Sequence, residues 1–257
     1  MHDIQNEPDS RGIAIDEVGI SGLRYPVTFD DGHTHQQGIA DIAVTVALQA
    51  QRRGTHMSRM IALVHEEAAT LTPQELPAVL KRGLTLLDTP ALTLTLSLPI
   101  ATQVTAPASG QESWQIHDVT VTGRIDEGSC TVATAVTTHV TSLCPCSKAI
   151  SDYGAHNQRS EITLEVTGTS DTPYPLPVHE VIALLRTSGS APVIPLIKRP
   201  DERVVTMQAY DHPVFVEDII RDISLTCREK GLNHMIRAKN LESIHSHDAI
   251  ASLTYTD

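Results

Sequence analysis

The sequence is poor in aromatic residues, cysteine and positive charge, and it has no long hydrophobic run. Its 257 residues include one Trp, five Tyr and two Phe, and only four Cys. Four cysteines are too few for a disulfide scaffold and suit a reducing compartment. The most apolar stretch, residues 39–50, contains Asp41 and is far shorter than the roughly 20 residues that span a bilayer. These absences exclude disulfide-rich secreted modules and membrane-spanning proteins.

The charge balance is acidic. Nineteen Lys and Arg stand against 31 Asp and Glu, which gives a formal net charge of −12. This balance argues against broad, non-specific binding to nucleic acid or to anionic membranes. The first ten residues, MHDIQNEPDS, lack the basic and apolar regions of a signal peptide. We therefore expect a soluble protein of the cytoplasm.

Histidine is abundant, with thirteen residues in the chain. Imidazole titrates near neutral pH and is a common metal ligand, so this excess invites a search for metal or proton-transfer chemistry.

Alternating apolar and polar residues predict strands. Residues 92–98 read LTLTLSL, which places Leu92, Leu94, Leu96 and Leu98 on one face. The same period of two recurs within residues 42–48, 119–121, 132–140 and 162–166. An antiparallel sheet with one face in water is the natural home of this pattern.

Helical spacing predicts two pairs of helices, in residues 57–68 and 76–87 and then in 178–185 and 216–227. With the strands, the element order is ββααββ twice, which predicts an α+β fold rather than a doubly wound parallel sheet. The expected domains are residues 1–127 and 128–257, with a hairpin tip or flexible loop at 99–112. The expected strands are 17–29, 38–50, 91–106, 113–126, 130–142, 160–168, 233–242 and 246–255.

The segment SLCPCSKAISDYGAHNQR, residues 142–159, carries the strongest chemical signal. It delivers Cys144, Cys146 and His156 on one loop between two expected strands. A thiolate and an imidazole are suitable ligands for a divalent metal ion, but two ligands do not complete a site. Taken alone, the segment is equally compatible with small buried cysteines and a solvated histidine.

Two further segments carry charge. IKRPDERVV, residues 197–205, reads as a mixed-charge loop between Pro195 and Pro200 that could be solvated or could supply a third metal ligand or an anion contact. In HPVFVEDIIRDI, residues 212–223, Glu217 lies in an expected first helical turn. The helix dipole alone explains an acidic residue there, although its carboxylate could also accept two hydrogen bonds from a flat heterocycle.

Two short polar segments complete the candidates. In ESIHSHDA, residues 242–249, His245 and His247 share one face of an expected strand, where they could be exposed or could shuttle protons. In THMSRM, residues 55–60, Ser58 and Arg59 open an expected helix and could hold phosphate.

Read together, these segments resemble a known family. Six segments resemble, in sequence and in order, those of the type IB GTP cyclohydrolases, and the similarity extends over nearly the whole chain. They are VGISGLRYPV, HMSRM, SLCPCSKAISDYGAHNQR, IKRPDE, AYDHPVFVED and ESIHSHDA. The resemblance implies two tandem tunnelling-fold units, each ββααββ, and a homotetramer with active sites between subunits.

The resemblance also implies a reaction, in which GTP and water give 7,8-dihydroneopterin triphosphate and formate at the entry to folate and pterin synthesis. By position in the motifs, Cys144, His156 and Glu202 are similar to the family's metal ligands. A metal ion lowers the pKa of its bound water, which can then attack C8 of guanine at neutral pH. The mixed thiolate, imidazole and carboxylate set favours zinc, manganese or ferrous iron, with no organic cofactor.

The same comparison assigns the substrate contacts. Glu217 is similar to the residue that holds the guanine edge, and His247 and His245 to proton-transfer groups. The candidates for the triphosphate, chosen by charge and position, are Arg59, Ser58, Lys198 and Arg199. Cys146 matches the motif without an assigned role.

Two other readings stay open at this point. One is a tunnelling-fold enzyme that acts on another purine or pterin through a Cys144 or Cys146 nucleophile, and a covalent adduct without a metal requirement would favour it. The other is a non-catalytic protein in which Cys144 and His156 hold a structural metal.

Overall fold

The computed structural model describes residue 5 and residues 7–257. The described residues form ten strands with interspersed helices and two irregular helical turns, a π-helical turn at Val64–Ala68 and a 3₁₀ turn at Pro73–Glu75. The strands are β1 (Ile15–Asp30), β2 (His35–Leu48), β3 (Thr70–Leu71), β4 (Ala91–Thr105), β5 (Glu112–Asp126), β6 (Ser129–Leu143), β7 (Asn157–Thr169), β8 (Ala191–Pro192), β9 (Asn233–Asn240) and β10 (Ala249–Tyr255). The helices are α1 (Met57–Leu63), α2 (Leu76–Leu87), α3 (Pro145–Ile150), α4 (Val178–Thr187), α5 (Arg199–Asp211) and α6 (Val216–Glu229). The α+β class predicted from the alternation and helical spacing is confirmed.

The strands join in the order β10-β9-β7-β6-β5-β4-β2-β1-β3, with β8 paired to β6. The pairs β1–β2, β2–β4 and β9–β10 are antiparallel. Contacts divide the chain into two compact units. Unit 1 runs to Leu98 and adds Thr120–Thr134 and Thr167–Pro175, and unit 2 comprises Pro99–Val119, Ala135–Val166 and Leu176–Asp257. The expected boundary at 127/128 divides the chain by the order of its elements, not by contacts, and it stays a prediction.

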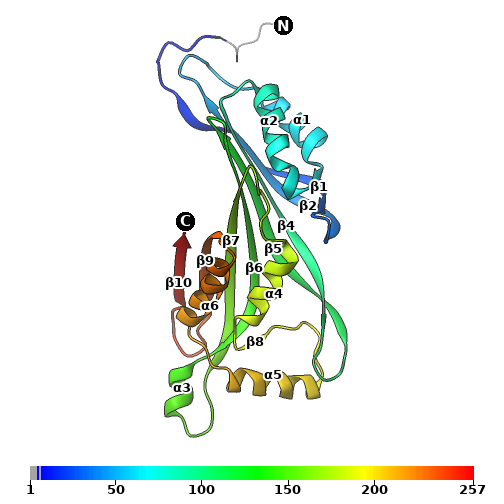
Figure 1. The fold of residues 1–257 in the computed structure, drawn as a ribbon, viewed down its shortest axis with the longest axis vertical. Helices are drawn as coiled ribbons and strands as arrows, with labels where there is room; N and C mark the ends of the chain where they lie inside the picture. Colours follow the sequence, from blue (N-terminus) through cyan, green and yellow to red (C-terminus); the bar gives the residue numbers. More distant parts are fainter. Residues whose placement is uncertain (1–4, 6) are drawn as a thin grey trace. The chain divides into compact units, whose positions relative to one another are not determined.

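The core of unit 1 lies between its strands and the helices α1 and α2, which lie side by side (Figure 1). Leu92, Leu94 and Leu96 of β4 are buried, as the alternation predicts. Met57 and Ile61 are instead 45% and 43% exposed. The expected helix over residues 57–68 is α1, which ends at Leu63, followed by the π-helical turn at Val64–Ala68. Its buried residues are Met60, Leu63, Val64 and Ala68.

Unit 2 packs α6 along β9 and β10, and α3 and α5 lie at one end of this unit (Figure 1). The helix α6 buries a stripe at the predicted spacing, formed by Val216, Ile219, Ile220, Ile223 and Cys227. Residues 106–111 form the tip of the β4–β5 hairpin, so most of the expected loop at 99–112 is strand. Within the described residues, no helix is both long and apolar enough to cross a membrane.

Three local expectations for unit 2 are wrong. Residues 197–205 are not a loop, because α5 begins at Arg199. Pro200 lies in the first turn of α5, where a missing N–H costs nothing and the fixed φ favours the helix. The segment 142–159 is not all loop, since it contains α3. The strands β9 and β10 are shorter than expected, so residues 241–248 form an irregular connection and His245 and His247 do not lie on a strand.

Candidate active site

Cys144 and His156 are held together by hydrogen bonds at the end of β6. The N–H of Cys144 donates to the carbonyl of His156 at 3.0 Å. Ser147 contacts both residues, since its N–H donates to Cys144 Sγ at 3.4 Å and its hydroxyl accepts the N–H of His156 at 3.3 Å. Cys144 thus caps α3 with its sulfur, and one short segment holds a thiol and an imidazole in fixed relation.

The imidazole of His156 is oriented by Gln158. Its Nδ1 lies 2.8 Å from Gln158 Oε1. An amide oxygen only accepts, so Nδ1 carries the hydrogen and Nε2 keeps its lone pair for a metal ion or a proton. This second partner on the imidazole is typical of a ligating histidine.

Glu242 places a carboxylate beside this imidazole. Its Oε2 lies 3.7 Å from His156 Nδ1, and both side chains are only 11% exposed. Within residues 5 and 7–257, this buried oxygen has no hydrogen-bond partner. An unpartnered buried carboxylate oxygen is costly, and a bound cation would relieve that cost. The donors around Cys144 and His156 therefore fit a divalent metal ion.

His245 lies next to His156, and His247 lies next to His245. The rings of His245 and His247 are stacked, with centroids 5.1 Å apart, and His245 meets His156 edge-on at 6.3 Å. The structure therefore brings together the predicted ligand His156 and the two predicted proton-transfer residues. His245 and His247 reach this position although residues 241–248 do not form a strand.

A buried hydrogen-bond network holds the two polypeptide segments that carry these groups. The hydroxyl of Ser160 donates to Asn240 Oδ1 at 2.6 Å, and Asn240 Nδ2 donates to Ser142 Oγ at 3.2 Å. The Ser142 hydroxyl in turn donates to the carbonyl of Val214 at 2.9 Å. Ser142 lies two residues before Cys144 and Asn240 two residues before Glu242, so the network fixes the start of both segments.

Glu202 lies on the face of α5 that packs toward this loop. Val205 and Ala209, three and seven residues later, pack with Leu143 and Ala155, which directly precede Cys144 and His156. Residues three and seven apart share a helix face, so Glu202 continues this face by one turn. Its side chain is exposed. No cluster of three or more His, Cys, Asp or Glu side chains suited to a metal occurs among the described residues, so the structure joins neither Glu202 nor Glu242 to Cys144 and His156 in a three-ligand group.

The first turn of α6 carries two adjacent carboxylates, Glu217 and Asp218, which have different surroundings. Asp218 Oδ2 accepts the N–H of Phe215 at 3.0 Å, which completes the helix start. Glu217 is exposed, and the bond to the N–H of Phe215 is made by Asp218 and not by Glu217. The helix start therefore accounts for Asp218 and leaves the carboxylate of Glu217 available to a ligand.

The four triphosphate candidates are exposed and belong to different units. Ser58 and Arg59 lie in α1 of unit 1, whereas Lys198 and Arg199 lie at the start of α5 in unit 2. Their roles stay predictions.

Comparison with known proteins decides the family. Residues 1–251 match the family model described as type I GTP cyclohydrolase folE2. The chain belongs to this cyclohydrolase family. The resemblance carried by the CPCSK and YGAH segments is thereby confirmed.

Relatives named GTP cyclohydrolase FolE2 match over nearly their whole length. The protein from Herminiimonas arsenicoxydans is 42% identical over 97% of this chain and 95% of its own. The protein from Cupriavidus necator is 41% identical over 98% and 93%, and that from Neisseria gonorrhoeae 39% identical over 98% of each chain.

Solved structures show the fold. Uricase from Arthrobacter globiformis superposes with a TM-score of 0.57 at 8% identity and covers 94% of this chain and 93% of its own. Urate oxidase from Bacillus sp. TB-90 gives 0.54 at 8% identity, with 95% and 100% covered. These likenesses confirm the tunnelling fold predicted for the cyclohydrolase family.

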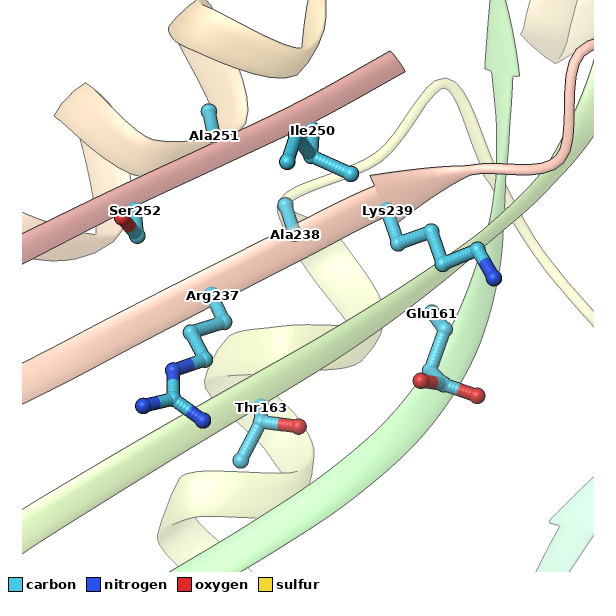
Figure 2. Close-up of a pocket in the computed structure, with 8 residues that line it drawn as sticks. All are labelled: Glu161, Thr163, Arg237, Ala238, Lys239, Ile250, Ala251 and Ser252. Atoms are coloured by element: carbon cyan, nitrogen blue, oxygen red, sulfur yellow. The ribbon is translucent and has the colours of Figure 1, made fainter. Parts of the chain in front are cut away.

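A cavity of about 510 Å³ lies elsewhere in unit 2, on the exposed face of β7, β9 and β10 (Figure 2). Arg237 and Lys239 of β9 line it together with Glu161 of β7. Lys239 is paired with Asp248 at 3.0 Å. None of the site residues predicted from this chain's sequence lines the cavity.

Sequence reasoning missed three residues that the structure adds to the site: Glu242, Gln158 and Ser147. Glu242 lies three residues before His245 in the same polar segment, so its carboxylate was visible in the sequence. Gln158 follows His156 by two residues, the spacing of side chains on one strand face. Ser147 carried no comparable signal, because a serine in a first helical turn is common.

Proposed function

We propose that this chain is a metal-dependent GTP cyclohydrolase that converts GTP and water to 7,8-dihydroneopterin triphosphate and formate, the entry step to folate and pterins. The observation that carries the proposal is the pairing of Cys144 with His156 beside a carboxylate oxygen of Glu242 that accepts no hydrogen bond within the described part of the chain. Family membership supports the same activity.

Cys144, His156 and Glu202 would hold one divalent ion, with Glu242 as a further oxygen donor. Zinc, manganese or ferrous iron suits this mixed donor set. When bound, the ion would supply Lewis-acid chemistry and hydroxide at neutral pH for attack on C8 of guanine. Gln158 and Ser147 keep the imidazole and the thiol in place for this role.

The other residues act on the substrate. The carboxylate of Glu217 accepts the adjacent N1–H and exocyclic N–H groups of guanine, a pairing that fits one carboxylate. His245 and His247 deliver protons to the ring nitrogens as the imidazole ring of guanine opens, since an imidazole side chain can both donate and accept a proton. The candidates for the triphosphate are those expected from the sequence: Arg59, Lys198 and Arg199 supply positive charge, and the hydroxyl of Ser58 can donate a hydrogen bond.

We further propose that the enzyme works as a homotetramer in the cytoplasm, with sites completed between subunits. The four cysteines are all free, which suits a reducing compartment.

The direct test is turnover. Protein purified without oxygen and loaded with Zn²⁺, Mn²⁺ or Fe²⁺ is expected to release formate from GTP, with an equal amount of a pterin that fluoresces after oxidation. Metal-stripped protein serves as the control and should be inactive until one ion is restored. Absence of turnover with all three ions would refute the proposed function.

Replacement Glu217→Gln is expected to weaken substrate binding by about 10- to 100-fold, because an amide places a donor against a guanine donor. Metal content should not change. The measurement is KM for GTP together with elemental analysis. Asp222→Asn is the matched control, since Asp222 is exposed on the same helix and loses the same charge.

Inosine triphosphate, which lacks the exocyclic amine, sharpens this test. It should bind more weakly than GTP to the wild type and lose little further affinity in Glu217→Gln. An unchanged KM for GTP in Glu217→Gln would contradict the role of Glu217.

A further inference from the structure

Asp201 is a fully buried carboxylate at the start of α5. Its Oδ1 accepts the N–H groups of Ala108 and Ser109, each at 2.7 Å. Its Oδ2 accepts the hydroxyl of Ser109 at 2.6 Å and the N–H of Lys198 at 2.8 Å. A carboxylate this deeply buried is tolerated only when its oxygens are satisfied in this way.

Most of these bonds do not serve the helix itself. Capping α5 requires only the bond from Lys198. The other three come from the hairpin tip, residues 106–111, which lies more than 90 residues earlier in the chain. Asp201 therefore joins the first turn of α5 to the tip of the β4–β5 hairpin.

The rest of α5 is held by other contacts. Val205 and Ala209 pack against Leu143 and Ala155. Near the end of the helix, the ammonium of Lys148 donates to the carbonyl of Tyr210 and lies 4.2 Å from the centre of its ring. In the first turn, Asp201 is the buried residue.

We propose that Asp201 is a positioning residue for the metal site: by joining the first turn of α5 to the hairpin tip, it fixes the place of the adjacent Glu202. This inference rests on the proposed function, in which Glu202 is a metal ligand. The role is indirect, since the carboxylate of Asp201 is fully used by four donors and has none left for an ion or a substrate.

The test is metal affinity rather than turnover. Asp201→Asn replaces one acceptor oxygen by a donor that faces two other donors. It should weaken binding of Co²⁺, measured by titration of the stripped protein, by about 10- to 100-fold, the usual effect of losing a group that orients a ligand. Glu202→Gln should weaken Co²⁺ binding at least as much. The double variant should be no weaker than Glu202→Gln, because Asp201 acts through Glu202.

The thiolate-to-cobalt absorption band supplies a second readout. It reports the sulfur of Cys144, so it should persist at saturating Co²⁺ in Asp201→Asn. Co²⁺ affinity within twofold of wild type, or additive losses in the double variant, would overturn the inference. A Glu202→Gln variant that binds Co²⁺ as tightly as wild type would also overturn the inference. The proposed function is tested separately, because it depends on whether the wild-type protein turns over GTP.

Asp31→Asn is the matched control for stability. Asp31 is a buried carboxylate of unit 1 that accepts the N–H groups of His33 and Thr34 and the hydroxyl of Tyr174. It should lower stability without changing Co²⁺ affinity, and an equal loss of affinity would count against a specific role for Asp201. If Asp201→Asn does not fold, Ser109→Ala removes one of the four bonds and should weaken Co²⁺ binding by about two- to tenfold; no change there would overturn the inference.

Discussion

Cys144→Ala is expected to reduce formate release from GTP by on the order of 10³-fold or more, because the loss of the proposed metal ligand would remove several kcal/mol of transition-state stabilisation. Bound metal should fall in parallel. Stability should change much less, since the mutation removes one capping bond, from Ser147 N–H to the sulfur, which is worth about 1 kcal/mol. The measurements are steady-state kinetics, elemental analysis and urea unfolding.

Cys227→Ala is the matched control. Burial raises the pKa of the Cys227 thiol to about 11, so this sulfur is neither a thiolate nor a ligand at neutral pH. Its removal leaves a small cavity under α6 and should lower the free energy of unfolding by about 1 kcal/mol, with metal content and turnover kept. The opposite pattern, in which Cys144→Ala unfolds the protein as metal is lost, would instead identify a structural metal site.

The strands could be predicted from the sequence because one face of the sheet is in water. Leu92, Leu94 and Leu96 alternate with Thr and are all buried, so period and burial agree. The helix α6 was readable for the same reason, since its apolar residues recur at helical spacing over three turns.

The helix α5 was missed because it contributes little apolar surface. Only Asp201 and Ala209 are buried in it, and an aspartate does not signal a core position. Its start is instead fixed by Pro200 and by the bonds of Asp201 to the hairpin tip. Those bonds join residues more than 90 positions apart, so no local pattern could have indicated them.

The site could be predicted in part. Cys144 and His156 lie on one segment, and the sequence motif brings them together without knowledge of the fold. The approach of Glu242 to His156 depends instead on Asn240, which bonds to Ser142 across the sheet. That contact is long-range, and Glu242 was therefore passed over although it stood in a segment already singled out.

Acidification from pH 7 to about 4.5 is expected to destabilise the protein through His117. This histidine is buried, with Nε2 2.9 Å from Thr102 Oγ1 and Nδ1 2.8 Å from Thr138 Oγ1. Burial, with smaller contributions from the positive charge of Arg186 and from His139, lowers its pKa from 6.5 to about 4. The unfolded chain therefore binds more protons than the native protein between these two pKa values. Stability from this residue is complete above pH 6.5 and is lost as the pH falls, by about 3 kcal/mol at pH 4.

His117→Gln tests this assignment, because glutamine can bond to the threonine hydroxyls but does not titrate. The variant should be less stable than wild type at pH 7, where the fit of the imidazole is lost. Its free energy of unfolding in urea should fall less steeply between pH 6.5 and 4.5, so the two curves converge on acidification. His212→Gln, at an exposed position just after α5, should keep the wild-type slope. Parallel curves for wild type and His117→Gln would contradict the role of His117, because a side chain that does not titrate would then have left the acid sensitivity unchanged.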